Sequence, residues 1–585
     1  MHWWRRLVKR IILLLVPLLG VGLITYRLLS VQAGPHLLAL VPRESFCVLE
    51  MRHPVRILSR LLSSPAGRYF SGAQWPDLLK HAASSPGLEQ GVSGGSTLTV
   101  CTLVDTLLRA PDHFLLDTGV FALVPPEAGQ SHPGPETGTP LLLGRLRNRH
   151  AFARLVTYLD RTRHLRPVIR ERIQGNVVLR YQLPGHGVLF MGRYKDVFLV
   201  SPVKAVLAQA ISLARAERGV NKHSLFGESF FVQGRGQAGK DLVLSAYVNV
   251  LALERVHARP SRQFGLVPFL SLLTGKGLNR IVLVWRQDQG ISEVSAAIGF
   301  QEPGVSPLVR LCSLRTPVRN PELANVPAGL TTYFWSNWFS PASWWQIFLA
   351  NSGKNTQQYR QLADGIMQKY LNLSMADLTA LFEYDWSVFV TGIKQSAFVP
   401  VPRFCFRLGM IEPQRLARVI GDNIAALPHR LEIVSSIKVT SLIMAGGLME
   451  PSYSFIGRDL WLFDGYDQVK PLLEPGPDRL TDDPLFQAVV KNPDKPVNMQ
   501  LYVRLQPVIR GLLELQPWLT KLLTERNRPV KPVHRVLLEG MKTVLHGLAG
   551  FDAAFVSARM RSGQLNTQIR LLEGDAKETG NRNDE

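Results

Sequence analysis

The amino-acid sequence predicts an α+β protein in which two similar tandem lobes of antiparallel sheet with packed helices follow an N-terminal transmembrane helix. Three observations carry this prediction: an uncharged apolar run near the N-terminus, short strand-like segments that alternate with helical periodicity, and patterns that recur in the same order in both halves. The chain has 585 residues, of which 46 % are hydrophobic and 19 % charged, so it can build several cores.

The first expected element is a basic stub and membrane anchor at residues 1–30. Four Lys and Arg residues precede the sixteen-residue run IILLLVPLLGVGLITY, which carries no charge. As a helix this run is about 24 Å long. Arg27 alone follows closely, so the positive-inside rule places the N-terminus in the cytoplasm and the folded part across the membrane. A signal peptide cleaved after Ala33 remains the alternative.

Recurring patterns indicate that the rest of the chain contains two copies of one unit. In each half a Val-Pro pair opens a strand-like and then a helix-like segment. A Phe-x-Gly-Arg motif, a Tyr-Val strand and a pair of glycines flanking an arginine follow in that order. The paired positions are 41–42 with 326–327, 190–193 with 455–458, 242–250 with 498–505, and 277–290 with 550–563.

These pairs place an α+β lobe A at 37–302 and a similar lobe B at 322–574. The segment 303–321 contains four prolines and is interpreted as a linker. The acidic tail at 575–585 is expected to be disordered.

Within each lobe, short β-branched or aromatic segments separated by few turn residues predict antiparallel strands. Apolar residues at helical spacing predict helices packed on one face of the sheet. The clearest strand segments are 119–126, 140–148, 176–192 and 196–201, and the clearest helix segments are 149–165, 203–216 and 413–427.

The net charge of +22 favours anionic partners, namely phospholipid headgroups, acidic glycans or nucleic acid. A folded part across the membrane argues against nucleic acid. No Cys-x-x-Cys pair and no zinc-ligand spacing occurs in the sequence, so we expect no metal and no cofactor. The four cysteines, Cys47, Cys101, Cys312 and Cys405, lie far apart, and their pairing stays open.

The basic N-terminus, the single span, the opening at Val41-Pro42 and the repeated strand–Gly–strand–turn–helix units form one pattern. It resembles an uncharacterised family of bacterial single-pass membrane-anchored envelope proteins, whose domain has no known function. The resemblance covers most of the chain after the anchor. It implies a bacterial inner-membrane location with a cytoplasmic N-terminus and a periplasmic bulk, and it implies no activity.

Two motifs that look catalytic are better explained as connections. GVSGG at 91–95 fits G-x-S-x-G with Ser93 as the nucleophile, but the strand-like segment follows the serine instead of preceding it. GRGQAGKD at 234–241 nearly fits a phosphate-binding loop, but Asp241 stands where Ser or Thr is needed. We therefore expect a turn and a flexible connector, and no catalytic residue.

Two segments are candidates for ligand or membrane contact. Segment 333–348 holds four of the eleven tryptophans, which suit membrane interfaces and ligand grooves, with core packing as the competing interpretation. Segment 145–180 holds ten arginines, whose guanidinium groups bind phosphate and carboxylate, with a solvated helix face as the competing interpretation. The candidate residues are Trp335, Trp338, Trp344, Trp345, Arg145, Arg147, Arg149, Arg161, Arg163 and Arg166.

The leading functional hypothesis is a non-enzymatic, membrane-anchored envelope protein that acts as an extracytoplasmic scaffold or interaction protein. The second hypothesis is a binding, carrier or sensor protein for a lipid or anionic envelope molecule. The third is a hydrolase whose site is not visible in the sequence. The expected partners are the membrane, through the N-terminal helix, and an anionic lipid or envelope protein.

Overall fold

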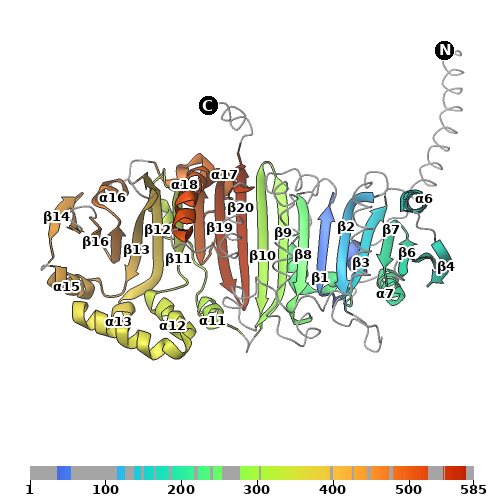
Figure 1. Ribbon diagram of the computed structural model, residues 1–585, viewed down its shortest axis with the longest axis horizontal. Coiled ribbons are helices and arrows are strands. Elements are labelled where there is room, and N and C mark those ends of the chain that lie inside the picture. Colours follow the sequence, from blue (N-terminus) through green and yellow to red (C-terminus); the bar gives the residue numbers. More distant parts are fainter. Residues whose placement is uncertain are drawn as a thin grey trace, which may run out of the picture. The chain divides into compact units, whose positions relative to one another are not determined.

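The computed structural model describes residues 36–53, 115–125, 138–146, 150–163, 167–182, 188–216, 222–236, 241–252, 277–301, 305–395, 400–424, 427–444, 450–473, 478–524, 545 and 547–574. The predicted anchor at 1–30 and the tail at 575–585 lie outside these residues. Within the described stretches, no helix is both long and apolar enough to cross a membrane. The protein is α+β, as predicted, and the neighbouring strands within each of its units pair antiparallel (Figure 1).

The described residues form two compact units, and each is considered by itself. Unit 1 contains the described residues up to 252 together with 280–284, and unit 2 contains the others. The division is close to the predicted lobes, whose own boundaries stay a prediction.

Eight strands of unit 1 lie side by side, and each neighbouring pair is antiparallel. Their spatial order is β8 (Leu242–Asn249), β1 (Cys47–Arg52), β2 (Leu115–Val124), β3 (Thr139–Leu146), β7 (Val197–Ser201), β6 (Val188–Tyr194), β5 (Asn176–Gln182) and β4 (Pro167–Ile173). The described helices of unit 1 are α6 (Ala151–Arg163), α7 (Lys204–Arg215) and the short α8 (Ser229–Arg235). Ala151, Leu155 and Leu159 recur every four residues on α6, and all three are buried against the sheet, which explains the periodicity of this segment.

Unit 2 repeats this strand order. The equivalent strands are β18 (Met499–Arg504), β11 (Thr332–Ser336), β12 (Phe382–Gln395), β13 (Pro400–Met410), β17 (Asp459–Phe463), β16 (Ser452–Ile456), β15 (Ile437–Leu442) and β14 (His429–Val434). Beyond β18 follow β19 (Phe551–Arg561), β20 (Gln564–Glu573), β10 (Ile291–Phe300) and β9 (Leu278–Asp288), whose residues 280–284 belong to unit 1.

The helices of unit 2 gather near the two ends of its strands (Figure 1). They are α11 (Pro307–Ser313), α12 (Pro341–Asn351), α13 (Thr356–Leu371), α14 (Met375–Ala380), α15 (Pro413–Ile424), α16 (Val469–Leu473), α17 (Pro484–Val489) and α18 (Leu505–Thr524). Helix α11 lies inside the segment expected to be a linker, and it packs in one apolar cluster with Trp338 and Phe339.

Equivalent strands of the two units also share their register. Val48 pairs with Tyr247 in unit 1, and Tyr333 pairs with Tyr502 in unit 2. A β-bulge interrupts the β2–β3 pair between Leu115 and Gly119. A β-bulge at the matching place interrupts the β12–β13 pair between Phe382 and Trp386. The positions of one unit can therefore be matched to those of the other residue by residue.

Two of the recurring patterns fall on matching positions outside these strands. Pro42 forms a β-bridge with Ser224, and Pro327 forms one with Arg479. In each unit the residue before the proline is a buried valine. The Val-Pro pair thus opens both units in the same way.

The glycine patterns behave differently from one another. Gly290 and Gly563 occupy matching hairpin turns with φ of 77° and 71°, a conformation that favours glycine. Gly192, however, lies inside β6, paired within the strand, whereas Gly457 lies in the β16–β17 turn with φ of 59°. The hairpins match, but the Phe-x-Gly-Arg motif is shifted along them, so this part of the sequence comparison paired non-equivalent positions.

Candidate functional site

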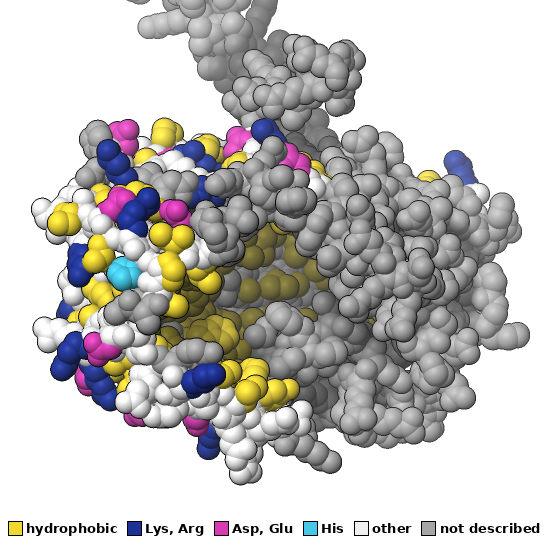
Figure 2. Space-filling view, turned by 60° about the vertical axis from the view of Figure 1, so that its left-hand side comes forward, with side chains coloured by type: hydrophobic (Ala, Val, Ile, Leu, Met, Phe, Trp, Pro, Cys, Tyr) yellow, Lys and Arg dark blue, Asp and Glu magenta, His cyan; other side chains and the backbone are white. Residues whose placement is uncertain are grey.

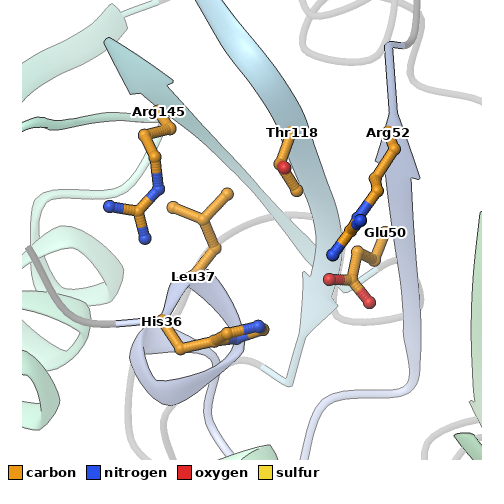
Figure 3. A pocket seen from close by; sticks show the side chains of 6 residues that line it. All are labelled: His36, Leu37, Glu50, Arg52, Thr118 and Arg145. Carbon is orange, nitrogen blue, oxygen red and sulfur yellow. The ribbon is translucent and has the colours of Figure 1, made fainter. Parts of the chain in front are cut away.

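A cavity of about 190 Å³ opens within unit 1 and is the first candidate site (Figure 3). The described residues of its lining are His36, Leu37, Glu50, Arg52, Thr118 and Arg145. Three different strands and the turn before them supply these side chains, so the cavity depends on the fold of the unit.

The strand register explains why four of these residues meet. Glu50 and Arg52 are two apart on β1, so they point to the same face of the sheet. Arg52 pairs directly with Thr118 on β2. Arg145 lies on β3, which is the next strand beyond β2.

Glu50 is buried, and its negative charge is matched by a buried cation. Arg235, at the end of α8, donates from Nε to Oε2 at 2.8 Å and from Nη2 to Oε1 at 2.9 Å. The hydroxyl of Ser245 on β8 donates to Oε2 at 2.9 Å. This two-point ion pair holds the carboxylate on one side of the cavity.

His36 lies at the start of the described chain, directly before the 3₁₀ turn η1 (Leu37–Leu40). Its Nδ1 accepts a hydrogen bond from the backbone N–H of Leu38 at 3.3 Å, which sets the direction of the ring. Partial desolvation of the ring by neighbouring atoms lowers the pKa of His36, although the residue keeps an exposed side; the Glu50 charge opposes this shift and the nearby guanidinium groups add to it. The imidazole therefore stays neutral at neutral pH and can donate from Nε2.

Arg145 is held by Asp196, whose Oδ2 accepts from Nη1 at 2.5 Å. Around the cavity, Arg145 forms an ion pair with Asp196 and Arg235 forms one with Glu50, while Arg52 adds a third guanidinium to the lining. The six lining residues include no serine or cysteine that a histidine could activate as a nucleophile. The arrangement is suited to holding a small anion.

The matching place in unit 2 is filled. Trp335 stands where unit 1 has Glu50, and its indole Nε1 donates to Asp385 Oδ1 at 2.6 Å. The buried Arg407 reaches Asp385 and Glu322 at 3.0 Å each and Asp459 at 2.9 Å. One buried guanidinium and one buried indole thus occupy the matching place, beside three acids that stay 20–24 % exposed.

Two carboxylates of this cluster carry raised pKa values. Burial raises the pKa of Glu322, while Arg407 lowers it and the neighbouring carboxylates raise it further. Burial also raises the pKa of Asp459, against the lowering effect of Arg407. Arg407 therefore does not fully compensate the burial of these partly exposed acids.

The second candidate site is an apolar row on one face of the unit 2 sheet. One residue from each of eight neighbouring strands contributes, and successive members pair directly across the strands. All eight side chains are apolar and none is fully buried. In spatial order the row is Val294, Ile569, Val556, Leu501, Phe334, Val388, Phe406 and Leu462.

Among the described elements, the helices that pack on this face of the sheet do so near the strand ends. Helices α11, α12, α14 and α15 lie over one end, and α18 lies over the other. The opposite face packs into the main buried core, which includes Tyr333, Phe389 and Tyr502. Figure 2 shows a hollow on the described part of the molecule, and its floor is formed by hydrophobic side chains.

The predicted tryptophan candidates separate into two pairs. Trp335 and Trp338 are buried and pack in two different core clusters. Trp344 and Trp345 lie on α12, where Trp344 is 49 % exposed and the ring of Trp345 stacks on Phe348 at 5.5 Å. Only the second pair is placed where it can touch a partner.

The predicted arginine candidates also divide. Arg145 lines the unit 1 cavity, and Arg161 is exposed on α6. Arg163 ends α6. Arg147, Arg149 and Arg166 lie outside the described residues.

The structure gives no support to a catalytic or phosphate-binding role for the two glycine-rich motifs. Gly234 is inside the last turn of α8 and Gly236 follows as its C-cap, whereas a phosphate-binding loop requires a helix that begins there. Ser93 lies outside the described residues. The described part of the chain contains no cluster of three or more His, Cys, Asp or Glu side chains suited to a metal, and Cys47, Cys312 and Cys405 are free.

Sequence reasoning missed most residues of both sites. Glu50, Arg52 and Thr118 are ordinary strand residues, and the last is far from the others along the chain. The apolar row was missed because the alternation of residues along a strand distinguishes the two faces of the sheet. It does not tell which face is covered by helices. The available signal was the apolar character of both faces in β11 and β12, which is unusual for a solvated sheet.

No family model matches the sequence, and no curated protein matches it. Among solved structures, crystal form I of TP0453 has a TM-score of 0.25 and 9 % identity and covers 48 % of this chain and 84 % of that chain. Form III has a TM-score of 0.25 and 11 % identity and covers 48 % and 86 %, and form IV has 0.22 and 11 % and covers 46 % and 81 %. The chain is distantly similar in structure to TP0453.

Proposed function

We propose that the protein is a non-enzymatic, membrane-anchored envelope protein that binds the acyl portion of a lipid on the open face of the unit 2 sheet. The observation that carries this proposal is the apolar row. At about 4.8 Å between strands, eight members span about 34 Å. A contiguous apolar row of this extent, whose members all keep part of their surface exposed, favours a binding site, because apolar surface left in water is unfavourable.

The aromatic side chains on this face of the unit 2 sheet favour a lipid over a polar ligand. Phe334 and Trp386 pack together with ring centroids 4.8 Å apart, and Phe404 and Phe406 meet edge to face. The indole Nε1 of Trp386 is buried and has no hydrogen-bond partner. Such a donor can bind an ester or carboxyl oxygen of a ligand whose chains lie on the aromatic rings.

The remaining parts of the proposal concern organisation and place. We propose that 37–302 and 322–574 are a tandem duplication joined by 303–321, supported by the shared strand order and register. The predicted N-terminal anchor would hold both units on the periplasmic side of a bacterial inner membrane. The net charge of +22 favours an anionic lipid over a neutral one.

The test is native mass spectrometry of the full chain released from detergent micelles. We expect a stoichiometric lipid adduct on the wild-type protein. Val388→Trp places a large ring in the middle of the row and should remove most of the adduct. Val177→Trp is the matched control, because it makes the same change on an exposed strand position of unit 1 (48 % exposed) and should leave the adduct unchanged.

A wild-type protein that carries no lipid in several detergents would overturn the proposal. So would an adduct of equal occupancy in the wild type and in Val388→Trp, since the lipid would then be bound elsewhere. Thermal unfolding of both variants, followed by tryptophan fluorescence, establishes that each is folded.

A second candidate function, a scaffold or interaction protein, is favoured by the outer surface of α12 and α13. Large apolar side chains recur there at helical spacing, and all are exposed: Trp344, Phe348, Tyr359, Leu362 and Ile366. A photo-crosslinking residue at Phe348, compared with one at the exposed Ile433 on β14, tests this function. Capture of the same envelope protein or anionic lipid from both positions would speak against a specific surface.

A further inference from the structure

The cavity of unit 1 is a separate site, which the proposed lipid-binding face does not use. A water molecule occupies about 30 Å³ in the liquid, so a cavity of about 190 Å³ has room for roughly six waters. It is too small for an acyl chain and large enough for a tetrahedral oxyanion with a few waters.

Its donors converge from three directions. In Figure 3 the guanidinium groups of Arg145 and Arg52 flank the cavity from β3 and β1, and the Thr118 hydroxyl lies between them on β2. The ring of His36 borders the side that η1 forms. Guanidinium forks and a hydroxyl are donor groups that phosphate oxygens accept from.

The acid in the lining does not cancel this preference. Both oxygens of Glu50 already accept hydrogen bonds from Arg235, and one also accepts from Ser245. The repulsion that Glu50 exerts on an anion is therefore reduced by the buried partner.

The matching place in unit 2 shows that the fold does not require a cavity. There Asp385 replaces Thr118, Trp335 replaces Glu50, and Glu322 replaces Leu37 by register. In unit 2 the buried Trp335 indole and three partly exposed acids lie at that place, whereas the unit 1 place is a cavity bordered by two arginines. An open polar cavity that the related unit has filled is best explained by a ligand.

We propose that the unit 1 cavity binds a phosphate group, which Arg52 and Arg145 hold through their guanidinium groups and Thr118 holds through its hydroxyl. The phosphate of a lipid headgroup and free inorganic phosphate share this chemistry. Figure 3 shows the three side chains that would face the group.

The test is calorimetric titration of inorganic phosphate into the full chain in phosphatidylcholine nanodiscs, at constant ionic strength. We expect saturable binding of one phosphate per chain. Arg52→Gln should weaken it by about tenfold to a hundredfold, because a hydrogen bond to a charged group is lost. Thr118→Asp, which installs the residue that unit 2 carries, should abolish binding, while Thr118→Ser should keep it.

Arg430→Gln is the control for a general loss of charge, because Arg430 is an exposed arginine of unit 2. It should leave the phosphate affinity unchanged. Absence of saturable phosphate binding in the wild type overturns the proposal. So does a phosphate affinity of Arg52→Gln and Thr118→Asp that equals the affinity of the wild type. Melting curves of all variants show whether they are folded, and Thr118→Ser keeps the test valid if Thr118→Asp does not fold.

The same titration in nanodiscs that contain phosphatidic acid separates the two sources of phosphate. If the ligand is a lipid headgroup, phosphatidic acid occupies the cavity and the heat of phosphate binding disappears in the wild type. If the ligand is free phosphate, the titration is unchanged. Either result supports the phosphate site and identifies its natural occupant class.

Discussion

The unit 1 cavity and the Arg407 cluster of unit 2 occupy the same place in one repeated strand order. In unit 1, Glu50 is opposite Ser245 and turns towards Arg235. In unit 2, Trp335 is opposite Gln500 at the matching register. One place is a cavity bordered by guanidinium groups, and the other holds a buried indole.

The difference teaches that a few side chains, and not the backbone, decide whether this place is a site. Arg235 comes seven residues after Glu228, the N-cap of α8. Val490 comes seven residues after Asp483, the N-cap of α17. Unit 1 therefore places a buried ion pair where unit 2 has an indole and a valine. A buried ion pair is seldom the more stable choice, which is consistent with its retention for binding.

The largest expected effect is in the Arg407 cluster. Arg407→Met removes the buried guanidinium that contacts Glu322, Asp385 and Asp459, so three partly buried carboxylates lose their shared ion-pair partner. We expect a loss of about 3–5 kcal/mol in the free energy of unfolding. Urea unfolding followed by tryptophan fluorescence measures it.

Arg458→Met is the matched control for this loss. Arg458 is 71 % exposed and pairs with Glu383 on the surface, so its removal should cost less than about 1 kcal/mol. Equal losses for the two variants would show that the Arg407 cluster is not a structural centre, and the comparison of the two places would fail.

The next effect comes from converting unit 1 into a copy of unit 2. Arg235→Val alone leaves Glu50 buried without its main partner and should also cost several kcal/mol, about 3–5. The double variant Glu50→Trp/Arg235→Val installs both residues of unit 2. We expect its free energy of unfolding to return to within about 1–2 kcal/mol of the wild type, because well-packed apolar groups replace a buried ion pair at little cost.

Phosphate binding adds a second measurement to the double variant. The indole should fill the cavity and remove phosphate binding while the unit stays folded. A double variant as unstable as Arg235→Val would mean that the two places differ in more than these side chains, and the register match would have to be abandoned there.

The sequence predicts those features of the fold that depend on residues close together along the chain. The helix at Ala151–Arg163 and the strand at Val197–Ser201 follow from local periodicity and composition, and both are present. The Val-Pro and Gly…Arg…Gly patterns fall on matching positions because a bridge and a positive φ restrict those residues. The Phe-x-Gly-Arg match failed because a strand and a turn both accept this motif.

The two candidate sites cannot be predicted from such local patterns. Trp335 belongs to a tryptophan-rich segment that suited a contact surface, but its strand register turns the indole into the core. Arg145 is the one predicted arginine that lines the cavity, and its partners Arg52 and Thr118 come from strands that only the sheet order brings together. Long-range register therefore carries the information that composition lacks.

A smaller effect tests the match between the units at their hairpins. Gly290→Ala and Gly563→Ala each force a side chain into a left-handed backbone conformation, at φ of 77° and 71°. Each should cost about 1 kcal/mol. A Cβ at Gly290 meets nothing within 4 Å and one at Gly563 meets the Phe300 carbonyl at 3.6 Å, so space adds little to either cost. Clearly unequal losses in urea unfolding would show that the two turns are not equivalent.

The smallest effect concerns the acidity of the Arg407 cluster. Burial holds the pKa of Glu322 above its ordinary value, so the folded state binds this proton more tightly than the unfolded chain does. Stability from this group is therefore present at low pH and is lost as the pH rises through the raised pKa. Glu322→Gln keeps an uncharged acceptor for Arg407 and removes the titration.

The stability of Glu322→Gln relative to the wild type should thus be more favourable at pH 7 than at pH 4. Asp459→Asn should change in the same direction, because burial raises the pKa of Asp459 as well. Urea unfolding of the three proteins at the two pH values measures this. The matching place of unit 1 has Leu37 at the position of Glu322, so Leu37→Met should show no such dependence on pH. If the relative stability of Glu322→Gln is the same at both pH values, or is more favourable at pH 4, the prediction is wrong. Arg407 would then fully compensate the charges of its acids.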